Sequence, residues 1–325
     1  MRIALNPLRW MLTLAAGTAL AGMAATGATE GWHDVLDSPA VQSPLAARSL
    51  LNGLARAGTR IVAVGQRGHI LYSDDAAKTW SQAEVPASSD LVAVHFPTAQ
   101  AGWAVGHDGV VLHTNDAGRS WQRQRDGRPD AADTPLLDVW FQDARTGYAV
   151  GAFGLILRTA DGGAHWQSLQ DAVDNPKKLH LYSVRGIADT LYIAGEQGLL
   201  LKLDPASGRF RALELPYKGT LFGVTGNARA VLAYGLRGNV VRSTDSGATW
   251  QAVATGVPVG LTASAVDAQG FILASQTGHI LASRDDGASF APIKIERPIP
   301  AAAVLTAGGA LVVAGPRGAQ IVPLR

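Results

Sequence analysis

One short motif recurs along this chain, and its clearest copy is Arg242-Ser243-Thr244-Asp245-Ser246-Gly247-Ala248-Thr249-Trp250. A Ser or Thr is followed two residues later by Asp, then by Gly, a second Ser or Thr, and Trp. Related copies end at Trp80, Trp121, Trp166 and Phe290, and a weaker copy ends at Phe210. The closing aromatic residues lie 40 to 45 residues apart, and a period of this length is typical of repeat proteins.

The residues of the motif have the chemistry of a tight turn. Asp, Ser and Thr side chains form hydrogen bonds with nearby backbone groups, Gly tolerates a positive φ, and the aromatic ring anchors the next segment. The motif resembles the Asp-box, or BNR repeat, which joins the third and fourth strands of a β-propeller blade. We therefore interpret its acidic and Trp residues as structural: Asp75, Asp116, Asp161, Asp204, Asp245, Asp285, Trp80, Trp121, Trp166 and Trp250.

Three apolar segments precede each copy of the motif. In the third repeat they are residues 136–141, 147–151 and 155–158, and their flanking Gly residues and alternation are typical of strands joined by hairpins. A Gly-x-x-Gly turn joins the second segment to the third and occurs seven times, with Ser275 replacing one Gly. Together with the Asp-box resemblance, these repeats predict an all-β protein, a seven-bladed β-propeller over residues 29–325.

The last repeat lacks a fourth strand, because there are seven Gly-x-x-Gly turns but only six copies of the box. Residues 31–39 resemble residues 79–86, which follow the first box. We therefore predict that residues 31–37 pair with residues 318–324 and close the last blade with an N-terminal strand. Such closure would remove exposed sheet edges.

Residues 1–28 have the pattern of a secretory signal peptide. Arg2 and Arg9 are followed by an apolar run over residues 10–25, and small residues follow at 24–28. The run has 16 residues, which is short of the roughly 20 needed to span a bilayer. We expect cleavage and a mature protein in the periplasm or outside the cell, with no direct membrane insertion.

The charges and residue types exclude several classes of function. The chain has 28 Lys and Arg and 26 Asp and Glu, so loss of Arg2 and Arg9 leaves 26 of each, and no basic excess favours nucleic acid as a partner. The chain has no Cys, which excludes disulfides, thiolate metal sites and Cys nucleophiles. The eight His are scattered, and no helix follows the Gly-x-x-Gly turns to bind phosphate. We expect neither a metal nor a cofactor.

The first strand of each propeller blade lines the central channel, so we looked there for catalytic residues. Alignment of the repeats predicts one inward residue per blade: Asn52, Ala93, Asp138, Ser183, Gly223, Ser264 and Ala302. Asp138 is the one carboxylate among them, whereas glycoside hydrolysis generally uses two. No spacing ties a Tyr–Glu pair to three Arg as a sialidase-like site requires. We therefore expect no catalytic residues; a glycan-binding, glycoside hydrolase or sialidase-like propeller is the alternative.

The remaining candidate surface is the face opposite the Asp-boxes. Arg67, Arg237 and Arg317 occupy the same slot of their Gly-x-x-Gly turns, and Arg is common at binding hot spots because its planar group makes several hydrogen bonds. A solvated rim is the alternative interpretation. The predicted partner-binding face consists of Arg67, Arg237, Arg317, His107, Asp108, Glu196, Lys177 and Lys178.

The full repeat pattern resembles the photosystem II stability/assembly factor family of seven-bladed propellers. It reads Leu-Leu-Asp-Val-x-Phe from residue 136, Gly-Tyr-Ala-Val-Gly-x-x-Gly-x-Ile from 147, and Thr-x-Asp-Gly-Gly-x-x-Trp from 159. The resemblance implies a non-catalytic partner of a membrane protein complex on the lumenal or periplasmic side. Bacterial relatives occur outside photosynthesis, some associated with membrane exporters. The resemblance also implies that the three turn arginines form a positively charged partner face.

Overall fold

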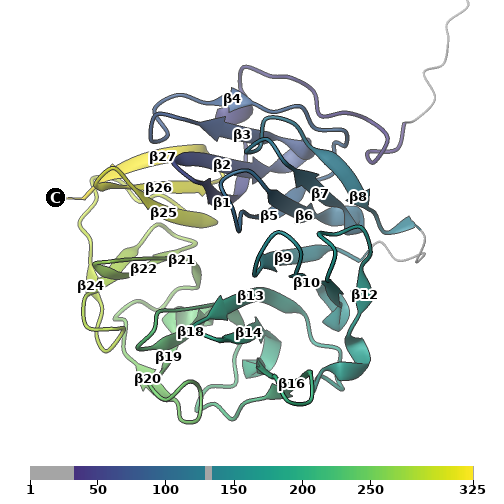
Figure 1. The fold of residues 1–325 in the computed structure, drawn as a ribbon. Helices are drawn as coiled ribbons and strands as arrows, with labels where there is room; N and C mark the ends of the chain where they lie inside the picture. The colour runs from purple at the N-terminus through teal and green to yellow at the C-terminus, as the bar shows by residue number, and fades with distance from the viewer. Residues whose placement is uncertain (1–32, 129–133, 325) are drawn as a thin grey trace, which may run out of the picture. The chain divides into compact units, whose positions relative to one another are not determined.

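Seven small antiparallel sheets follow one another around a ring (Figure 1). The computed structural model describes residues 33–128 and 134–324, and the ring belongs to the unit that begins at Asp34. Within the described ranges, six sheets have four strands and one has three. The predicted all-β, seven-bladed propeller is therefore confirmed. No helix in these ranges is long and apolar enough to cross a membrane.

The strands of each blade follow one another in sequence order from the first strand to the last. Blades one to three contain β1 (Leu51–Ala57), β2 (Arg60–Gly65), β3 (Ile70–Ser73), β4 (Ser81–Gln82); β5 (Leu91–His95), β6 (Gly102–Gly106), β7 (Val111–Thr114), β8 (Gln122–Arg125); and β9 (Leu136–Phe141), β10 (Gly147–Gly151), β11 (Ile156–Thr159), β12 (Gln167–Ser168). Blades four and five contain β13 (Leu181–Ile187), β14 (Thr190–Gly195), β15 (Leu200–Asp204), β16 (Arg209–Ala212); and β17 (Leu221–Gly226), β18 (Val231–Gly235), β19 (Val240–Ser243), β20 (Gln251–Val253). Blades six and seven contain β21 (Leu261–Asp267), β22 (Gly270–Ser275), β23 (Ile280–Ser283), β24 (Ala291–Pro292); and β25 (Ala303–Ala307), β26 (Ala310–Gly315), β27 (Gly318–Pro323). Short 3-10 helices include η1 (Ala46–Arg48), η2 (Gln66–Gly68), η3 (His107–Gly109), η5 (Ala152–Gly154), η6 (Gln170–Ala172), η7 (Glu196–Gly198) and η8 (Leu236–Gly238).

The hydrophobic core lies between neighbouring blades. Every residue of β2 and β10 is buried, because adjacent blades cover both faces of the second strand and favour a continuous apolar sequence there. Val64 and Ile70 of blade one, for example, pack in one cluster with Leu91 and Leu112 of blade two. Each blade is thus held by its neighbours, so only a closed or capped ring buries all of these faces.

The pairing of first with second strands corrects the predicted inward alignment in three blades. Gly53 and Ala303 pair with equivalent residues of their second strands, as Asp138 does. The predicted positions in blades one, six and seven are therefore one residue out of register, because the first strand's own sequence does not fix its register against the second strand. The equivalent set is Gly53, Ala93, Asp138, Ser183, Gly223, Ala263 and Ala303.

The prediction that residues 31–37 form the closing strand is wrong for the part that the structure describes, which begins at His33. Among the residues that the structure describes, blade seven has three strands, and the backbone N–H of Asp37 donates to the Asp34 carbonyl at 3.0 Å to form a turn. The Asp34 carboxylate accepts the Leu36 N–H at 2.9 Å. This side chain stabilises the local turn in place of an extended strand. Residues 31 and 32 lie outside the described ranges.

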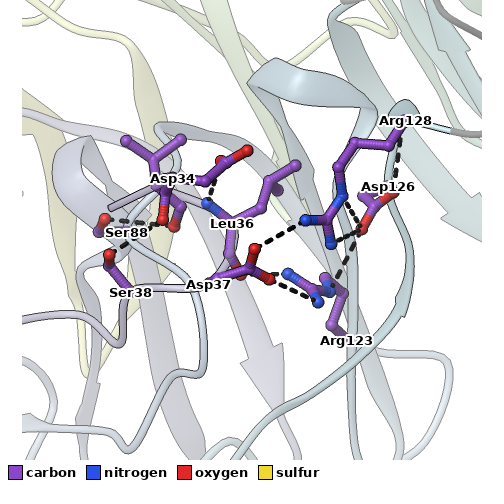
Figure 2. Close-up of polar contacts among 9 residues, drawn as sticks. Asp34, Leu36, Asp37, Ser38, Ser88, Arg123, Asp126 and Arg128 are labelled. Carbon is purple, nitrogen blue, oxygen red and sulfur yellow. Dashed lines mark hydrogen bonds and ion pairs between the residues drawn. The ribbon is translucent and has the colours of Figure 1, made fainter. Parts of the chain in front are cut away.

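The segment that follows His33 binds blades one and two instead (Figure 2). The Ser88 N–H donates to the Val35 carbonyl at 2.8 Å, and the Asp37 carboxylate pairs with Arg123 at 3.3 Å and with Arg128 at 2.8 Å. The ring closes without a shared sheet. Blade seven packs against blade one through an apolar cluster of Ile61, Ala77, Leu305, Ala307 and Val312.

Candidate functional site

The Asp-box carboxylates are bound inside their own turns. Asp245 Oδ1 accepts the Ser243 hydroxyl at 2.7 Å and the Thr249 N–H at 2.9 Å, and Oδ2 accepts the Thr249 hydroxyl at 2.6 Å. The same set of three hydrogen bonds holds Asp75, Asp116 and Asp285. Asp204 differs, because it accepts the Ala206 N–H and the Ser207 hydroxyl.

These hydrogen bonds favour the ionised carboxylates. The Thr79 hydroxyl and N–H lower the pKa of Asp75 to about 2, and the N–H and ring of His165 lower the pKa of Asp161 to about 2. The Ser289 and Ser283 hydroxyls likewise lower the pKa of Asp285 to about 2. Each carboxylate is stabilised as a hydrogen-bond acceptor of its own loop, on a separate blade.

The Gly-x-x-Gly turns lie on the other face of the ring. Successive antiparallel strands reverse direction, so the turn between second and third strands is opposite the box between third and fourth. We call this surface the turn face; it consists of residues 65–68, 106–109, 151–154, 195–198, 235–238, 275–278 and 315–318. In five of the turns the third residue has a left-handed backbone, with φ between 54° and 57°: Arg67, Asp108, Phe153, Gln197 and Arg237.

The basic and acidic side chains predicted on the turn face differ in their contacts with the rest of the protein. Arg67, Arg237 and Arg317 are exposed, and no ion pair within the described ranges involves their guanidinium groups. Asp108 instead accepts the Ser89 hydroxyl, and Glu196 accepts the His180 N–H at 2.9 Å. The arginines are therefore available to a ligand, whereas the two acids stabilise the loops between blades.

The structure places the other predicted residues of this face as follows. His107 is exposed beside Asp108 in η3. Lys177 donates from Nζ to Gln197 Oε1 at 3.4 Å, and Lys178 has a left-handed φ of 51° in the loop before blade four. Arg67 and Arg317 belong to neighbouring blades, as predicted from the closed ring.

The channel residue Asp138 links two blades and lies deep in the protein. Its carboxylate accepts the Val139 N–H at 2.9 Å and the Val184 N–H at 2.8 Å, and Arg185 also donates to it. Burial raises the pKa of Asp138, against the opposing effect of Arg185. Its hydrogen-bonding positions are therefore filled by protein groups, which is unlike a nucleophile or general acid that must face a sugar. In the described ranges, no group of three His, Asp or Glu could hold a metal.

The profile of one protein family, described as Photosynthesis system II assembly factor YCF48, matches residues 49–128 and 130–278. This chain belongs to that family. The predicted resemblance is thereby confirmed. A search of curated proteins found no match.

Two solved structures show the same fold as this YCF48-family chain. One, titled "YCF48 bound to D1 peptide", has a TM-score of 0.69 and 17% identity, and the match covers 88% of this chain and 96% of the other. The second, YCF48 from Cyanidioschyzon merolae, has a TM-score of 0.66 and 16% identity, with 87% and 98% covered. At these identities the likeness establishes the fold alone.

Sequence reasoning missed two apolar residues on the turn face of this YCF48-family member. Phe153 is 61% exposed at the tip of its turn, where its ring lies 4.9 Å from that of His180. Leu236 is 38% exposed beside Arg237. Phe153 occupies the slot held by Arg67 in blade one, so comparison of that slot across all repeats could have found it. Exposed apolar and Arg side chains together are typical of protein-binding surfaces.

Proposed function

We propose that this YCF48-family protein is a non-catalytic assembly factor that binds a protein of a membrane complex through its turn face. The observation that carries the proposal is the set of three exposed arginines on that face, which form no ion pair with any described residue, beside acids that are bound by their own loops. Exposed Phe153 adds an apolar contact. Arg and aromatic side chains supply much of the binding energy at protein interfaces.

The comparisons support a protein ligand. A structural neighbour was solved as YCF48 bound to D1 peptide, so a protein of this fold has been captured with a peptide from another chain. The occupied Asp-box and Asp138 carboxylates support a non-catalytic role. The expected partner is a protein, without nucleic acid or a cofactor.

We also propose that the protein is exported. The support is the charge and apolar pattern of residues 1–28, which lie outside the described ranges. Fractionation of cells that express the full chain should place a shortened product in the periplasm or the medium. A full-length product retained in the cytoplasm would contradict export without affecting the proposed binding face.

Charge reversal on the turn face tests the binding function. Cross-linking in intact cells identifies the captured protein, and the variant Arg67→Glu with Arg237→Glu should reduce its capture at least tenfold. A matched control is Arg119→Glu with Arg145→Glu, which reverses two exposed arginines on the Asp-box side of the ring. Equal capture by both variants would refute the turn face as the binding site, and turnover of fluorogenic sialosides would refute the non-catalytic assignment.

A further inference from the structure

Blade seven leaves one edge of its sheet open. In the other six blades a fourth strand covers the third, whereas no described strand pairs with the outer side of β27 (Gly318–Pro323). Among the described residues, η1 packs beside its first two residues, Gly318 and Ala319, and leaves the rest of the edge open. Native proteins generally cover such edges, because a row of unpaired N–H and C=O groups is a template for another strand. The family profile ends at residue 278, so this edge lies beyond the matched part of the chain.

The unpaired groups of the edge belong to Ala319 and Ile321. The Ala314 carbonyl accepts the Ala302 N–H, so the backbone groups of Ala314 face β25. Ala319 pairs with Ala314 and Ile321 with Val312. Because hydrogen-bonding direction alternates along antiparallel strands, the groups of Ala319 and Ile321 point away from β26.

In other blades, the outward carbonyl near the start of the third strand accepts a backbone N–H. In blade one, Ile70 pairs with Val64 of the second strand, as Ala319 pairs with Ala314 in blade seven. The Ile70 carbonyl accepts the Ala83 N–H at 2.8 Å. The Ile280 carbonyl of blade six accepts the Ile293 N–H at 2.8 Å. In both blades the donor belongs to the chain that runs along the outside of the third strand. The Ala319 carbonyl is the corresponding acceptor in blade seven.

A groove lies beside this edge, between β27 and the outer part of blade six. Its volume is about 1260 Å3, larger than the ~300–1,000 Å3 typical of small-molecule pockets. Apolar side chains on both walls include Ile293, Ile295, Ile321 and Val322, and Ile321 is 41% exposed. We call this space the edge groove.

The edge groove is basic at its turn-face end and carries both signs of charge at its Asp-box end, where Arg284 lies beside Asp285. Arg317 and Arg297 line it at the turn face, and neither forms an ion pair with a described residue. Asp267 and Asp285 line it at the Asp-box side. Glu296, an acid near Arg297, already has an interaction of its own. A strand antiparallel to β27 would therefore place its C-terminal end beside the two arginines.

We infer that the edge groove binds an extended segment of a partner protein as the fourth strand of blade seven. The segment is apolar at alternate positions and carries an acidic residue or a terminal carboxylate at its C-terminal end. Backbone hydrogen bonds to the edge supply affinity, and alternate side chains supply specificity. This inference rests on the proposed protein-binding function and adds the place and chemistry of a second contact.

Two other occupants fit the edge groove less well. Residues 34–40 of this chain are held on blades one and two by Ser88, Arg123 and Arg128 (Figure 2). A second copy would have to pair its own β27 with this one. Residues 291–299 line the groove beside β27, so a second copy would bring its own groove wall to the same edge, whereas a single extended segment brings none.

The test uses the full chain and a synthetic peptide with the sequence of residues 79–84, the part of the outer segment of blade one that ends in Glu84. Amide hydrogen exchange is followed by NMR. On saturation, exchange at Ala319 and Ile321 should slow at least tenfold, while Gln320 and Val322, whose N–H groups already face β26, change less than twofold. Docking through side chains alone would not produce this alternation.

Matched variants separate the backbone and charge contributions. Ile321→Pro removes one outward N–H and should abolish peptide binding, whereas Ile321→Thr keeps that N–H and should bind; thermal melting reports whether each variant is folded. Arg317→Glu should weaken binding about tenfold, or ~1.4 kcal/mol. Peptides with Gln in place of Glu84, or with an amidated C-terminus, distinguish a side-chain carboxylate from a terminal one.

Several outcomes would overturn the inference. They are absence of binding at millimolar peptide, binding without alternating protection, and protection of Ala319 and Ile321 in the free protein, which would show that residues 41–45 cover the edge. Protection that grows with protein concentration would instead show a second copy. If Ile321→Pro retains the cellular partner while Arg67→Glu with Arg237→Glu loses it, the proposed function stands and this inference fails.

Discussion

Acid should destabilise this propeller in part through the imidazole of His95, whose pKa is lowered to about 3. The ring nitrogen Nδ1 accepts the Phe141 backbone N–H at 3.1 Å, which joins blade two to blade three. Burial, and then the charge of Arg185, lower the pKa of His95 from 6.5 to about 3. Protonation of Nδ1 would also turn this acceptor into a donor that faces another N–H.

The size of the effect follows from the two pKa values. The folded pKa lies below the unfolded one, so the stabilisation is complete above about pH 6.5 and is lost as the pH falls toward 3. At pH 4.5, which is two units below the unfolded pKa, protonated imidazole outnumbers neutral imidazole by about a hundred to one in the unfolded chain, whereas the folded imidazole is still neutral. This difference in protonation lowers the unfolding free energy by about 2.7 kcal/mol. Because His95 is half-buried and not fully buried, we expect about 2 kcal/mol.

Urea unfolding followed by Trp fluorescence measures this difference. Between about pH 7 and pH 4.5, the wild type should lose about 2 kcal/mol more unfolding free energy than His95→Gln, which keeps a hydrogen-bond acceptor but does not titrate. Other groups titrate equally in both proteins, so the difference isolates His95. Equal losses in the two proteins would refute the assigned role of this histidine.

Three further predictions concern the stability of the ring. Asp138→Ala should lower the unfolding free energy, measured by urea unfolding, by about 3–5 kcal/mol, because Arg185 and two buried N–H groups lose their acceptor. Asp138→Asn keeps an acceptor and should lower the unfolding free energy by less. The pKa of about 2 for Asp75, Asp161 and Asp285 predicts stabilisation that is present above about pH 4 and lost as the pH falls toward 2, with NMR carboxyl titrations near 2. Gly318→Ala should lower the melting temperature more than Gly208→Ala, because an added Cβ at 318 would lie 1.9 Å from the Ala47 carbonyl and none lies near 208.

Local patterns were sufficient for the strands and turns. Predicted strands at 136–141 and 147–151 coincide with β9 and β10, and the segment predicted at 155–158 is β11 at 156–159. These segments alternate or are continuously apolar and are bounded by Gly, so their conformation follows from neighbouring residues. The predicted turn arginines likewise have the exposure that their shared slot implies.

Local patterns failed where two distant segments compete for one position. Residues 31–37 resemble a fourth strand, yet Asp34 stabilises a turn, and Arg123 and Arg128 hold Asp37 on blade two. Those arginines lie about 90 residues away in the sequence. No pattern within residues 31–37 can reveal a partner at that distance. The inward positions of blades one, six and seven were predicted one residue out of register because that register too depends on pairing with the second strand.

By itself the sequence determined the repeat period, the seven turns, the Asp-box loops and hence the propeller, because each depends on side chains within a few residues of one another. The tertiary structure alone decided that Asp138 is hydrogen-bonded between two blades and that Asp108 and Glu196 bind their own loops. It alone decided that, among the described residues, no strand pairs with the outer edge of blade seven and no ion pair involves the three turn arginines. These properties depend on which groups meet across blades. The free energy of such contacts is set by burial and by distant partners, which the order of residues along the chain does not display.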